Sequence, residues 1–430
     1  MDKINIGIIG FGTVGQGVIR ACLSKPKFLE EKIGRGLVLK SVCDKDLRHK
    51  RAVKLGSHIL TSDVNKILKD PDIQIVVELI GGVHPAKEFI LEAFRRGKHV
   101  VTANKALLAE YGEEIFQAAK AANVDLYFEA SVGGGIPIIK ALRESLGANR
   151  IDTLLGIVNG TSNYILTSMS EEGLSFNQAL LEAKKKGYAE RNPALDIQGF
   201  DSAHKLAILV LLGFGRSVDI RDIYVEGIED VSLSDIRYAQ DFGYVIKLLA
   251  IAKNVDGQLE VRVHPTFLSK EHLLSNVKGV YNAIYVHGDL AGGTLFYGRG
   301  AGSAPAASSV VSDIIDVARN IKNNSVNRVP IYVQDETIRK VRNINEIESR
   351  YYLRLSIIDK PGGLAKIATI LGQHGISIAS LIQKERKQAR IVPVAMMSHE
   401  AKEKNMRLAL EQINKLNVIK KKTVAIRVER

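Results

Sequence analysis

Cysteine is scarce in this sequence of 430 residues, which contains only Cys22 and Cys43. Two thiols cannot form the disulfide framework of a small secreted protein, so we expect both to be buried small hydrophobic residues in a reducing compartment. The chain also lacks any apolar run close to the roughly 18 residues that a bilayer span needs, and its start carries no signal-peptide pattern. These absences exclude an integral membrane protein and predict a cytoplasmic one without a membrane partner.

Acidic residues are outnumbered by basic ones, 47 against 60, which gives a net charge of +13. Part of the excess lies in short basic runs at residues 48–51, 184–186 and 420–422. No aromatic residues are interleaved with these runs, and the sequence shows no zinc-ligand spacing, helix-turn-helix or RNA-binding pattern. We therefore expect solvated basic surfaces and no nucleic-acid partner.

The remaining composition is that of a globular protein. Hydrophobic residues make up 46% and charged residues 25% of the chain, which excludes a disordered or fibrous protein. At about 150 residues per domain, the length predicts two to three domains with cores of their own.

A strand, a glycine-rich turn and a helix follow one another at the start of the chain. Residues 4–9 are an apolar run typical of a buried parallel strand, and residues 14–20 continue as a helix. The turn between them is Gly10-Phe11-Gly12-Thr13-Val14-Gly15. This order is the dinucleotide-binding fingerprint, because the glycines let backbone N–H groups approach a pyrophosphate at the positive end of the helix. It predicts that NAD or NADP binds here.

Further strands alternate with helices and predict a doubly wound parallel sheet. We expect them at residues 37–43, 73–80, 99–102 and 124–130. Ligands bind such sheets beyond the carboxyl ends of the strands. Glycines and polar residues gather at these ends, among them Asp44, Thr102 and Lys105.

The residues near the second strand leave the choice of cofactor open. Asp44 could accept a hydrogen bond from a ribose 2′-OH and favour NAD, although it lies 29 residues after Gly15, against about 20 in the usual fingerprint. Lys40, Lys45 and Arg48 could instead meet the 2′-phosphate of NADP, or could be ordinary surface charges.

Three further residues are candidates for proton transfer. Lys105 stands at the ligand edge of the sheet, where it either faces a ligand or is an ordinary surface lysine. Asp201 and Lys205 are four residues apart on one helical face, which is consistent with a capping residue and a surface ion pair. The apolar residues 206–212 that follow favour a buried helix instead, where the lysine could act as a general acid or base.

The C-terminal part shows a βαββαβ order. Its first strand is followed by Asp359-Lys360-Pro361-Gly362-Gly363-Leu364. This pattern resembles the ferredoxin-like ACT module. Between the two ends of the chain, residues 152–158, 222–227 and 279–286 are expected to be strands with long helices between them.

Taken together, these motifs resemble the monofunctional homoserine dehydrogenases over essentially the whole chain. The signatures are residues 10–15, Val101-Thr102-Ala103-Asn104-Lys105, Asn159-Gly160-Thr161-Ser162-Asn163-Tyr164-Ile165-Leu166, residues 187–205 and Gly300-Ala301-Gly302-Ser303-Ala304-Pro305. The resemblance implies NAD(P)-dependent interconversion of L-homoserine and L-aspartate 4-semialdehyde, in threonine and methionine biosynthesis.

The resemblance also implies roles for individual residues. Lys205 would donate or accept the proton, with Asp201 beside it and Lys105 sharing the transfer. The substrate would be bound by Glu190, Asp196, Gly160, Thr161, Gly187 and Lys105. The cofactor would be bound by residues 10–15 with Asp44, Thr102, Lys105 and Gly302. A monovalent cation, Na⁺ or K⁺, would be held by backbone carbonyls of Glu129, Val132, Gly134 and Ile136, although these glycine-rich residues could equally be a hinge.

The expected fold is α/β and α+β. It comprises a Rossmann domain at 1–135 completed by about 303–340, a catalytic and dimerisation domain at 136–302, and an ACT-like domain at 350–430. The last either senses L-threonine or only assists assembly into a homodimer or homotetramer. Alternatives are another amino-acid dehydrogenase, a glucose-fructose-type oxidoreductase, or a nucleotide-sensing regulator, which would need neither Asp201 nor Lys205.

Overall fold

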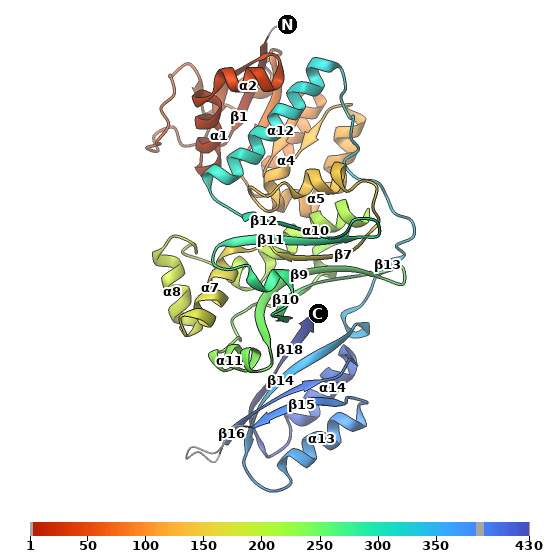
Figure 1. Cartoon of the computed structure of the whole chain (residues 1–430). Coiled ribbons are helices and arrows are strands. Elements are labelled where there is room, and N and C mark those ends of the chain that lie inside the picture. Colours follow the sequence, from red (N-terminus) through yellow and green to blue (C-terminus); the bar gives the residue numbers. More distant parts are fainter. Residues whose placement is uncertain (1–2, 384–390, 430) are drawn as a thin grey trace. The chain divides into compact units, whose positions relative to one another are not determined.

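The structure is a computed structural model that describes residues 3–383 and 391–429 (Figure 1). Packing divides the chain into two compact units. Unit 1 consists of Met1–Gly160, Asp201–Ile223 and Tyr281–Ile338, and unit 2 of Thr161–Phe200, Tyr224–Val280 and Arg339–Arg430. Both expected cysteine environments are confirmed, since Cys22 and Cys43 are free thiols and buried.

A parallel six-stranded sheet forms the centre of unit 1. Its strands are β1 (Lys3–Ile9), β2 (Gly36–Cys43), β3 (Leu60–Thr61), β4 (Ile73–Glu78), β5 (His99–Thr102) and β6 (Leu126–Tyr127). They are arranged in the order β3-β2-β1-β4-β5-β6, the order of the Rossmann fold. The expected doubly wound sheet is thereby confirmed. The strand expected over 124–130 is shorter, because the chain turns into a 3₁₀ helix at Glu129–Ser131.

Helices cover this sheet, which is why its strands are continuous apolar runs. They include α1 (Thr13–Ser24), α2 (Pro26–Ile33), α4 (Ala86–Arg95) and α5 (Lys105–Ala121). The helix α5 starts directly after the sheet's edge, because Asn104 caps it by accepting the N–H of Leu107 at 3.2 Å. Lys105 is therefore the first helical residue.

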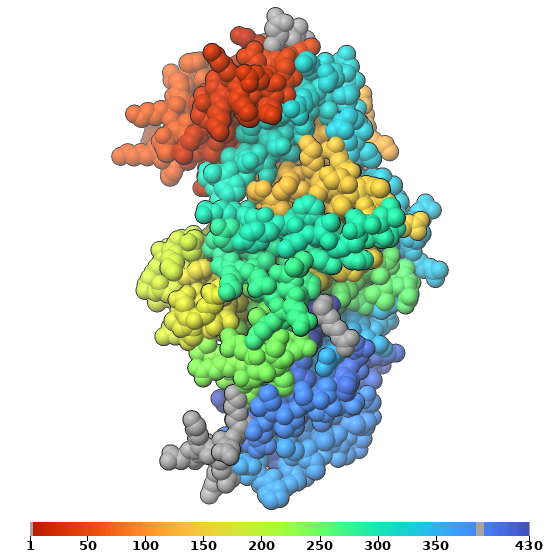
Figure 2. Space-filling model, viewed as in Figure 1, coloured from red at the N-terminus to blue at the C-terminus, as the bar shows by residue number. Residues whose placement is uncertain are grey.

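The helix α12 (Ser303–Asn323) returns to the sheet from far along the chain. It packs against α1 and α2, and in the space-filling view its turquoise atoms touch the red N-terminal ones (Figure 2). Val310, Ile314 and Val317 complete the same core as Ile6 and Ile8 of β1. The nucleotide-binding fold thus draws on two distant parts of the sequence.

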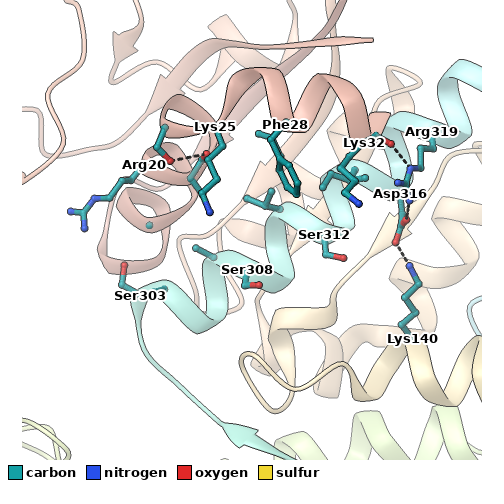
Figure 3. A pocket seen from close by; sticks show the side chains of 18 residues that line it. Arg20, Lys25, Phe28, Lys32, Lys140, Ser303, Ser308, Ser312, Asp316 and Arg319 are labelled. Atoms are coloured by element: carbon teal, nitrogen blue, oxygen red, sulfur yellow. Dashed lines mark hydrogen bonds and ion pairs between the residues drawn. The ribbon is translucent and has the colours of Figure 1, made fainter. Parts of the chain in front are cut away.

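A groove of about 680 Å³ runs between α1, α2 and α12 (Figure 3). Asp316 forms ion pairs with Lys140 and Arg319 beside it, and Arg319 also donates to the carbonyl oxygen of Lys32 at 2.8 Å. Half-exposed Phe28 lines the groove. These contacts fasten the returning helix to the rest of unit 1.

Unit 1 also contains three antiparallel strands. Its strands β7 (Ile151–Ile157), β11 (Tyr281–Gly288) and β12 (Gly292–Arg299) pair in the order β12-β11-β7. The strands expected at 152–158 and 279–286 are therefore confirmed to within two residues. The helix α10 (Phe200–Phe214) carries the buried apolar run that followed Lys205 in the sequence.

Unit 2 contains a long hairpin where helices were expected. Long helices are present between residues 158 and 222, but between residues 228 and 279 the only α-helix is α11 (Leu233–Asp241), which precedes β9 (Tyr244–Val255) and β10 (Gln258–Ser269). The expectation of long helices was wrong here, because a continuous apolar run suits a buried strand as well as a buried helix. The deciding residues are Asp256 and Gly257, whose φ angles of 55° and 74° form a two-residue hairpin turn. The strand expected at 222–227 is reduced to β8 (Tyr224–Val225).

The C-terminal part of unit 2 has the expected ferredoxin-like order. Its elements are β14 (Glu348–Ile358), α13 (Gly363–Gln373), β15 (Ile378–Gln383), β16 (Ile391–Ser398), α14 (Glu403–Ile413) and β18 (Ile419–Glu429). The four strands pair as β18-β14-β16-β15, and the end of β18 continues into pairing with β10. Within the described ranges, no helix combines the length and apolarity needed to cross a membrane.

Candidate active site

Asp201 lies at the centre of a charged cluster in unit 1. Its Oδ2 accepts hydrogen bonds from Lys205 Nζ at 2.6 Å and from Asn159 Nδ2 at 2.8 Å, and its Oδ1 is 3.0 Å from Lys105 Nζ. Lys205 Nζ also donates to the carbonyl oxygen of Val158 at 2.7 Å. The structure therefore brings the three expected proton-transfer residues together, with the partly exposed Lys105 paired to the buried Asp201.

Burial and charge compete at this carboxylate. Burial raises the pKa of Asp201, but the neighbouring ammonium groups of Lys205 and Lys105 outweigh it, so the pKa lies well below its ordinary value. Two cations then face one anion, which leaves a local net charge of +1. A cluster of this sign favours negative charge developing on a substrate oxygen. Lys205 is 9% exposed, so water screens this interaction little.

A buried network places Lys105 at the ends of β4 and β5. Glu78 Oε2 accepts a hydrogen bond from the Thr102 hydroxyl at 2.6 Å, and Thr102 Oγ1 accepts the N–H of Asn104 at 3.0 Å. Asn104 also donates to the carbonyl oxygen of Gly82 at 2.6 Å. Sequence analysis missed Glu78, although a single carboxylate closing an apolar strand at the ligand edge was a usable signal.

The expected substrate-binding residues, apart from Lys105, occupy helix starts and loops. Gly160 and Thr161 open α7 (Gly160–Glu171), where the Thr161 hydroxyl donates to the Tyr188 carbonyl oxygen at 2.7 Å. Gly187 and Glu190 are exposed in the loop that follows α8 (Phe176–Lys185).

Asp196 lies within the short helix α9 (Ala194–Ile197) of unit 2. Its carbonyl oxygen accepts the Ser162 hydroxyl at 2.8 Å. The segment that carries Asp196 is therefore tied to α7 through its backbone, and its side chain is half-buried.

A buried lysine secures α7 from the other side. Lys247 of β9 donates to Asn163 Oδ1 at 3.2 Å and to the carbonyl oxygen of Val277 at 2.5 Å. Asn163 itself donates to the carbonyl oxygens of Val277 and Gly279. Burial lowers the pKa of Lys247 to about 8.

This lysine makes stability dependent on pH. In the unfolded chain its pKa is about 10.4. Between about pH 8 and pH 10 the unfolded state therefore binds a proton that the folded state has lost, so Lys247 contributes up to about 3 kcal/mol more to the free energy of unfolding as the pH rises. Burial raises the pKa of Cys22 to about 12 and that of Cys43 to about 11, and these thiols act in the opposite direction. The contribution of Lys247 is therefore measured as a difference: in urea unfolding, the native protein and an exposed-lysine control, Lys420→Met, should gain stability relative to Lys247→Met between pH 8 and pH 10. The same pH dependence in both variants would contradict this role for Lys247.

The glycine-rich turn has the geometry that a pyrophosphate requires. Gly10 has a φ of 110°, and a Cβ at Gly15 would lie 2.1 Å from the Gly10 carbonyl oxygen, so both positions demand glycine. A Cβ at Gly12 would meet no atom within 4 Å. No side chain of the described residues caps α1 at Gly12, which leaves its first N–H groups for an anion. Thr13 and Val14 begin that helix.

Asp44 is held against this turn. Its Oδ2 accepts the N–H of Phe11 at 2.7 Å, and its Oδ1 is 3.1 Å from Arg51 Nη2. Arg51 also donates to the Phe11 carbonyl oxygen at 3.0 Å and stacks its guanidinium 4.7 Å from the Phe11 ring. Sequence analysis missed this arginine, which lay inside a basic run.

The other residues expected to bind the cofactor lie on different elements. Gly302 is the N-cap of α12 with a φ of 113°, and Thr102 ends β5. Lys40 lies 2.9 Å from Asp70 and 2.7 Å from Asp72, so it is already paired. The suggestion that Lys40 meets a 2′-phosphate is therefore not supported.

The expected cation-binding segment is buried. The Glu129 carboxylate accepts the N–H groups of Ile139 and Lys140, at 2.8 and 2.9 Å. The Gly134 carbonyl oxygen accepts the Ser309 hydroxyl at 2.7 Å, and that of Ile136 accepts the N–H of Ile138. Each carbonyl oxygen has two lone pairs, so the carbonyl oxygens of Gly134 and Ile136 could bind a cation while keeping these hydrogen bonds. The other two expected ligands are the carbonyl oxygens of Glu129 and Val132.

Comparison with known proteins assigns all three parts of the chain. Residues 10–129 match the family model "Homoserine dehydrogenase, NAD binding domain", residues 137–315 match "Homoserine dehydrogenase", and residues 351–418 match "ACT domain". A homoserine dehydrogenase of Neisseria gonorrhoeae is 43% identical over 100% of this chain and 99% of its own. The chain belongs to the homoserine dehydrogenase family. It is therefore an NAD(P)-dependent oxidoreductase, and the regulator alternative is wrong.

Solved structures agree with this assignment. The homoserine dehydrogenase of Thiobacillus denitrificans superposes with a TM-score of 0.93 at 43% identity, covering 99% of this chain and 98% of that one. A hyperthermophilic archaeal homoserine dehydrogenase in complex with NADPH reaches a TM-score of 0.63 at 29% identity, covering 73% of this chain and 97% of that one.

Proposed function

We propose that this chain interconverts L-homoserine and L-aspartate 4-semialdehyde with NAD or NADP, using Lys205 as the proton donor and acceptor. The observation that carries the proposal is the buried ammonium group of Lys205, which is held by Asp201 and by the Val158 carbonyl oxygen. A lysine ammonium has three N–H donors, and Asp201 and the Val158 carbonyl oxygen accept two of them. The third can reach a substrate oxygen.

When bound at the glycine-rich turn, NAD or NADP would supply or accept a hydride at the substrate carbon. Lys205 gives its third proton to the oxygen when the aldehyde is reduced, and takes the hydroxyl proton when the alcohol is oxidised. Asp201 fixes the position of the ammonium group and balances its charge. Lys105, on the opposite oxygen of the same carboxylate, shares the proton transfer and stabilises charge on the substrate oxygen.

The remaining roles follow from chemistry. The carboxylates of Glu190 and Asp196 suit the substrate's ammonium group, while Gly160 and Thr161 at the start of α7 and Gly187 in the loop after α8 complete the proposed substrate site. Na⁺ or K⁺ would be held by the backbone oxygens of Glu129, Val132, Gly134 and Ile136, beside the buried side chains of Glu129 and Asp313, the latter accepting the Glu129 N–H at 2.8 Å. Replacing both ions by a large organic cation should lower activity, and unchanged activity would count against the cation.

The direct test follows the absorbance of NADH or NADPH with homoserine as substrate. We expect turnover with at least one cofactor. If Arg48 meets a 2′-phosphate, Arg48→Ala should lower kcat/KM for NADP by about tenfold and leave NAD little changed, since one charged hydrogen bond contributes about 1.5 kcal/mol. No turnover of homoserine in folded enzyme would favour another amino-acid dehydrogenase.

The division at 1–135, 136–302 and 350–430 is part of the same proposal, with 303–340 completing the first domain. So are an L-threonine response of the ACT-like domain and assembly into a homodimer or homotetramer. Adding threonine to the assay tests the first of these two. Light scattering on the full chain tests the second.

A further inference from the structure

The carboxylate of Glu78 is buried at the ligand edge of the parallel sheet and takes no part in the mechanism proposed above. Glu78 ends β4 and is 0% exposed. Across residues 3–383 and 391–429, no lysine, arginine or histidine forms an ion pair with it. Burying an unpaired carboxylate is unfavourable unless hydrogen bonds replace the water that it loses. Its hydrogen bonds therefore decide what this side chain does.

Three donors face the two oxygens of this carboxylate. Glu78 Oε1 accepts the N–H of Ile80 at 2.8 Å, and the N–H of Gly81 lies 3.4 Å from the same oxygen. Glu78 Oε2 accepts the Thr102 hydroxyl at 2.6 Å. Burial raises the pKa of this carboxyl group, and these hydrogen bonds offset part of the rise. An ionised carboxylate accepts at both oxygens, so it satisfies all three donors.

The first oxygen holds the loop that follows β4, and this loop packs against the cofactor turn. A Cβ at Gly10 would lie 2.7 Å from the carbonyl carbon of Leu79, so the two backbones are in close contact. Beyond the contact, Gly81 and Gly82 both have a φ of 71°. A Cβ at either glycine would meet no atom within 4 Å, which leaves the space beside the loop open to a ligand.

The second oxygen holds the start of α5. The Thr102 hydroxyl that donates to Glu78 also accepts the N–H of Asn104 at 3.0 Å. Asn104 caps α5, and its Nδ2 donates to the Gly82 carbonyl oxygen at 2.6 Å. This last bond returns to the loop after β4 and closes a ring of contacts around Glu78. Lys105 is the next residue along the chain.

Glu78 thus connects the cofactor side of the site with the proton-transfer side. The loop that it holds packs on the turn expected to bind the pyrophosphate, and the helix start that it holds carries Lys105, 3.0 Å from Asp201. Both parts belong to unit 1. A misplacement of about 1 Å between reacting groups can lower a rate about 100-fold, so a fixed connection between the two sides has a direct effect on turnover.

We propose that Glu78 is a positioning residue for this reaction, whose carboxylate sets Lys105 relative to the cofactor turn without itself touching the substrate. The inference deepens the proposed function and rests on it for the roles of Lys105 and the turn. A role in stability alone would instead make Glu78 important for unfolding and unimportant for kcat.

The test compares Glu78→Gln with the native full-length enzyme. Glutamine keeps the shape but replaces one acceptor oxygen by an NH₂ donor, so it cannot accept from both Ile80 and Thr102. We expect kcat for homoserine oxidation to fall about tenfold or more, as for the loss of one charge-assisted hydrogen bond. KM for homoserine should stay within about twofold, and the dissociation constant of NADPH, measured by fluorescence titration, should rise about threefold or more.

A second variant, Thr102→Val, removes the hydroxyl and keeps the side-chain shape. It should lower kcat by a similar factor, and the double variant should be no worse than the weaker single variant within about threefold, because both changes break the same connection. The matched control is Glu114→Gln, on α5, whose carboxylate forms an exposed pair with Lys87 at 2.6 Å. It should keep native kcat and NADPH affinity.

The proposal is overturned if folded Glu78→Gln melts at a lower temperature but keeps native kcat, or if kcat falls while NADPH affinity is unchanged. It is also overturned if the effects of the two substitutions on kcat multiply. Should Glu78→Gln not fold, native kcat in Thr102→Val would overturn it. Homoserine turnover by the native enzyme is measured first, and NADPH titration does not depend on the substrate, so failure of the proposed function is recognised separately.

Discussion

Replacing Lys205 by methionine should lower kcat for homoserine oxidation by about a thousandfold, within the 10²–10⁴ range of a lost general acid or base. Methionine fills the same buried space, and Asp201 keeps Lys105 and Asn159 as partners. The cofactor turn at Gly10–Gly15 is built from other elements. NADPH affinity should therefore stay within about twofold. Steady-state kinetics and a fluorescence titration with NADPH measure the two quantities.

Lys185→Met is the matched control for this variant. Lys185 also pairs with a carboxylate, Glu182 at 2.8 Å, but the pair is exposed, so its loss should leave kcat unchanged. A folded Lys205→Met enzyme that keeps more than a tenth of native kcat would contradict the assignment of the proton donor. Normal kcat with weakened NADPH binding would instead place Lys205 with the cofactor.

Gly12→Val should abolish most cofactor binding without unfolding the protein. The φ of Gly12 is −79°, which valine adopts, and a Cβ there meets no atom within 4 Å. The added side chain would occupy the space in front of the first N–H groups of α1. Losing two charge-assisted hydrogen bonds to the pyrophosphate raises the dissociation constant of NADPH about 100-fold or more.

The fold of this variant is checked against Gly372→Val, a glycine of α13 that also has open space around its Cβ. Both variants should show native circular dichroism, and only Gly12→Val should lose NADPH affinity, as measured by calorimetry. Unchanged affinity in Gly12→Val would show that the pyrophosphate does not approach this turn.

Local sequence was sufficient for the nucleotide-binding fold. A buried strand, the turn Gly10–Gly15 and a helix are adjacent in the chain, and each has its own signal: apolar run, glycine spacing, helical period. The same holds for Asp201 and Lys205, because residues four apart in a helix share a face, and the structure joins them at 2.6 Å.

Local sequence was insufficient for the hairpin of β9 and β10. Val245–Ala252 within β9 is apolar apart from Lys247, so its period does not separate helix from strand. The Asp256-Gly257 turn was the one local signal, and its meaning depends on the flanking strands pairing.

By itself, the sequence determined the fold class, the cofactor turn and the pair Asp201–Lys205, since each depends on residues that are neighbours along the chain. Only the tertiary structure decided that Lys105 and Asn159 meet the same carboxylate, and that Arg51 packs on Phe11. It also buries the hydroxyl of Thr423 with no hydrogen-bond partner among the residues that the structure describes. These groups lie on different elements, and their contacts depend on how the sheets and helices pack. Packing brings together residues that no spacing along the chain relates.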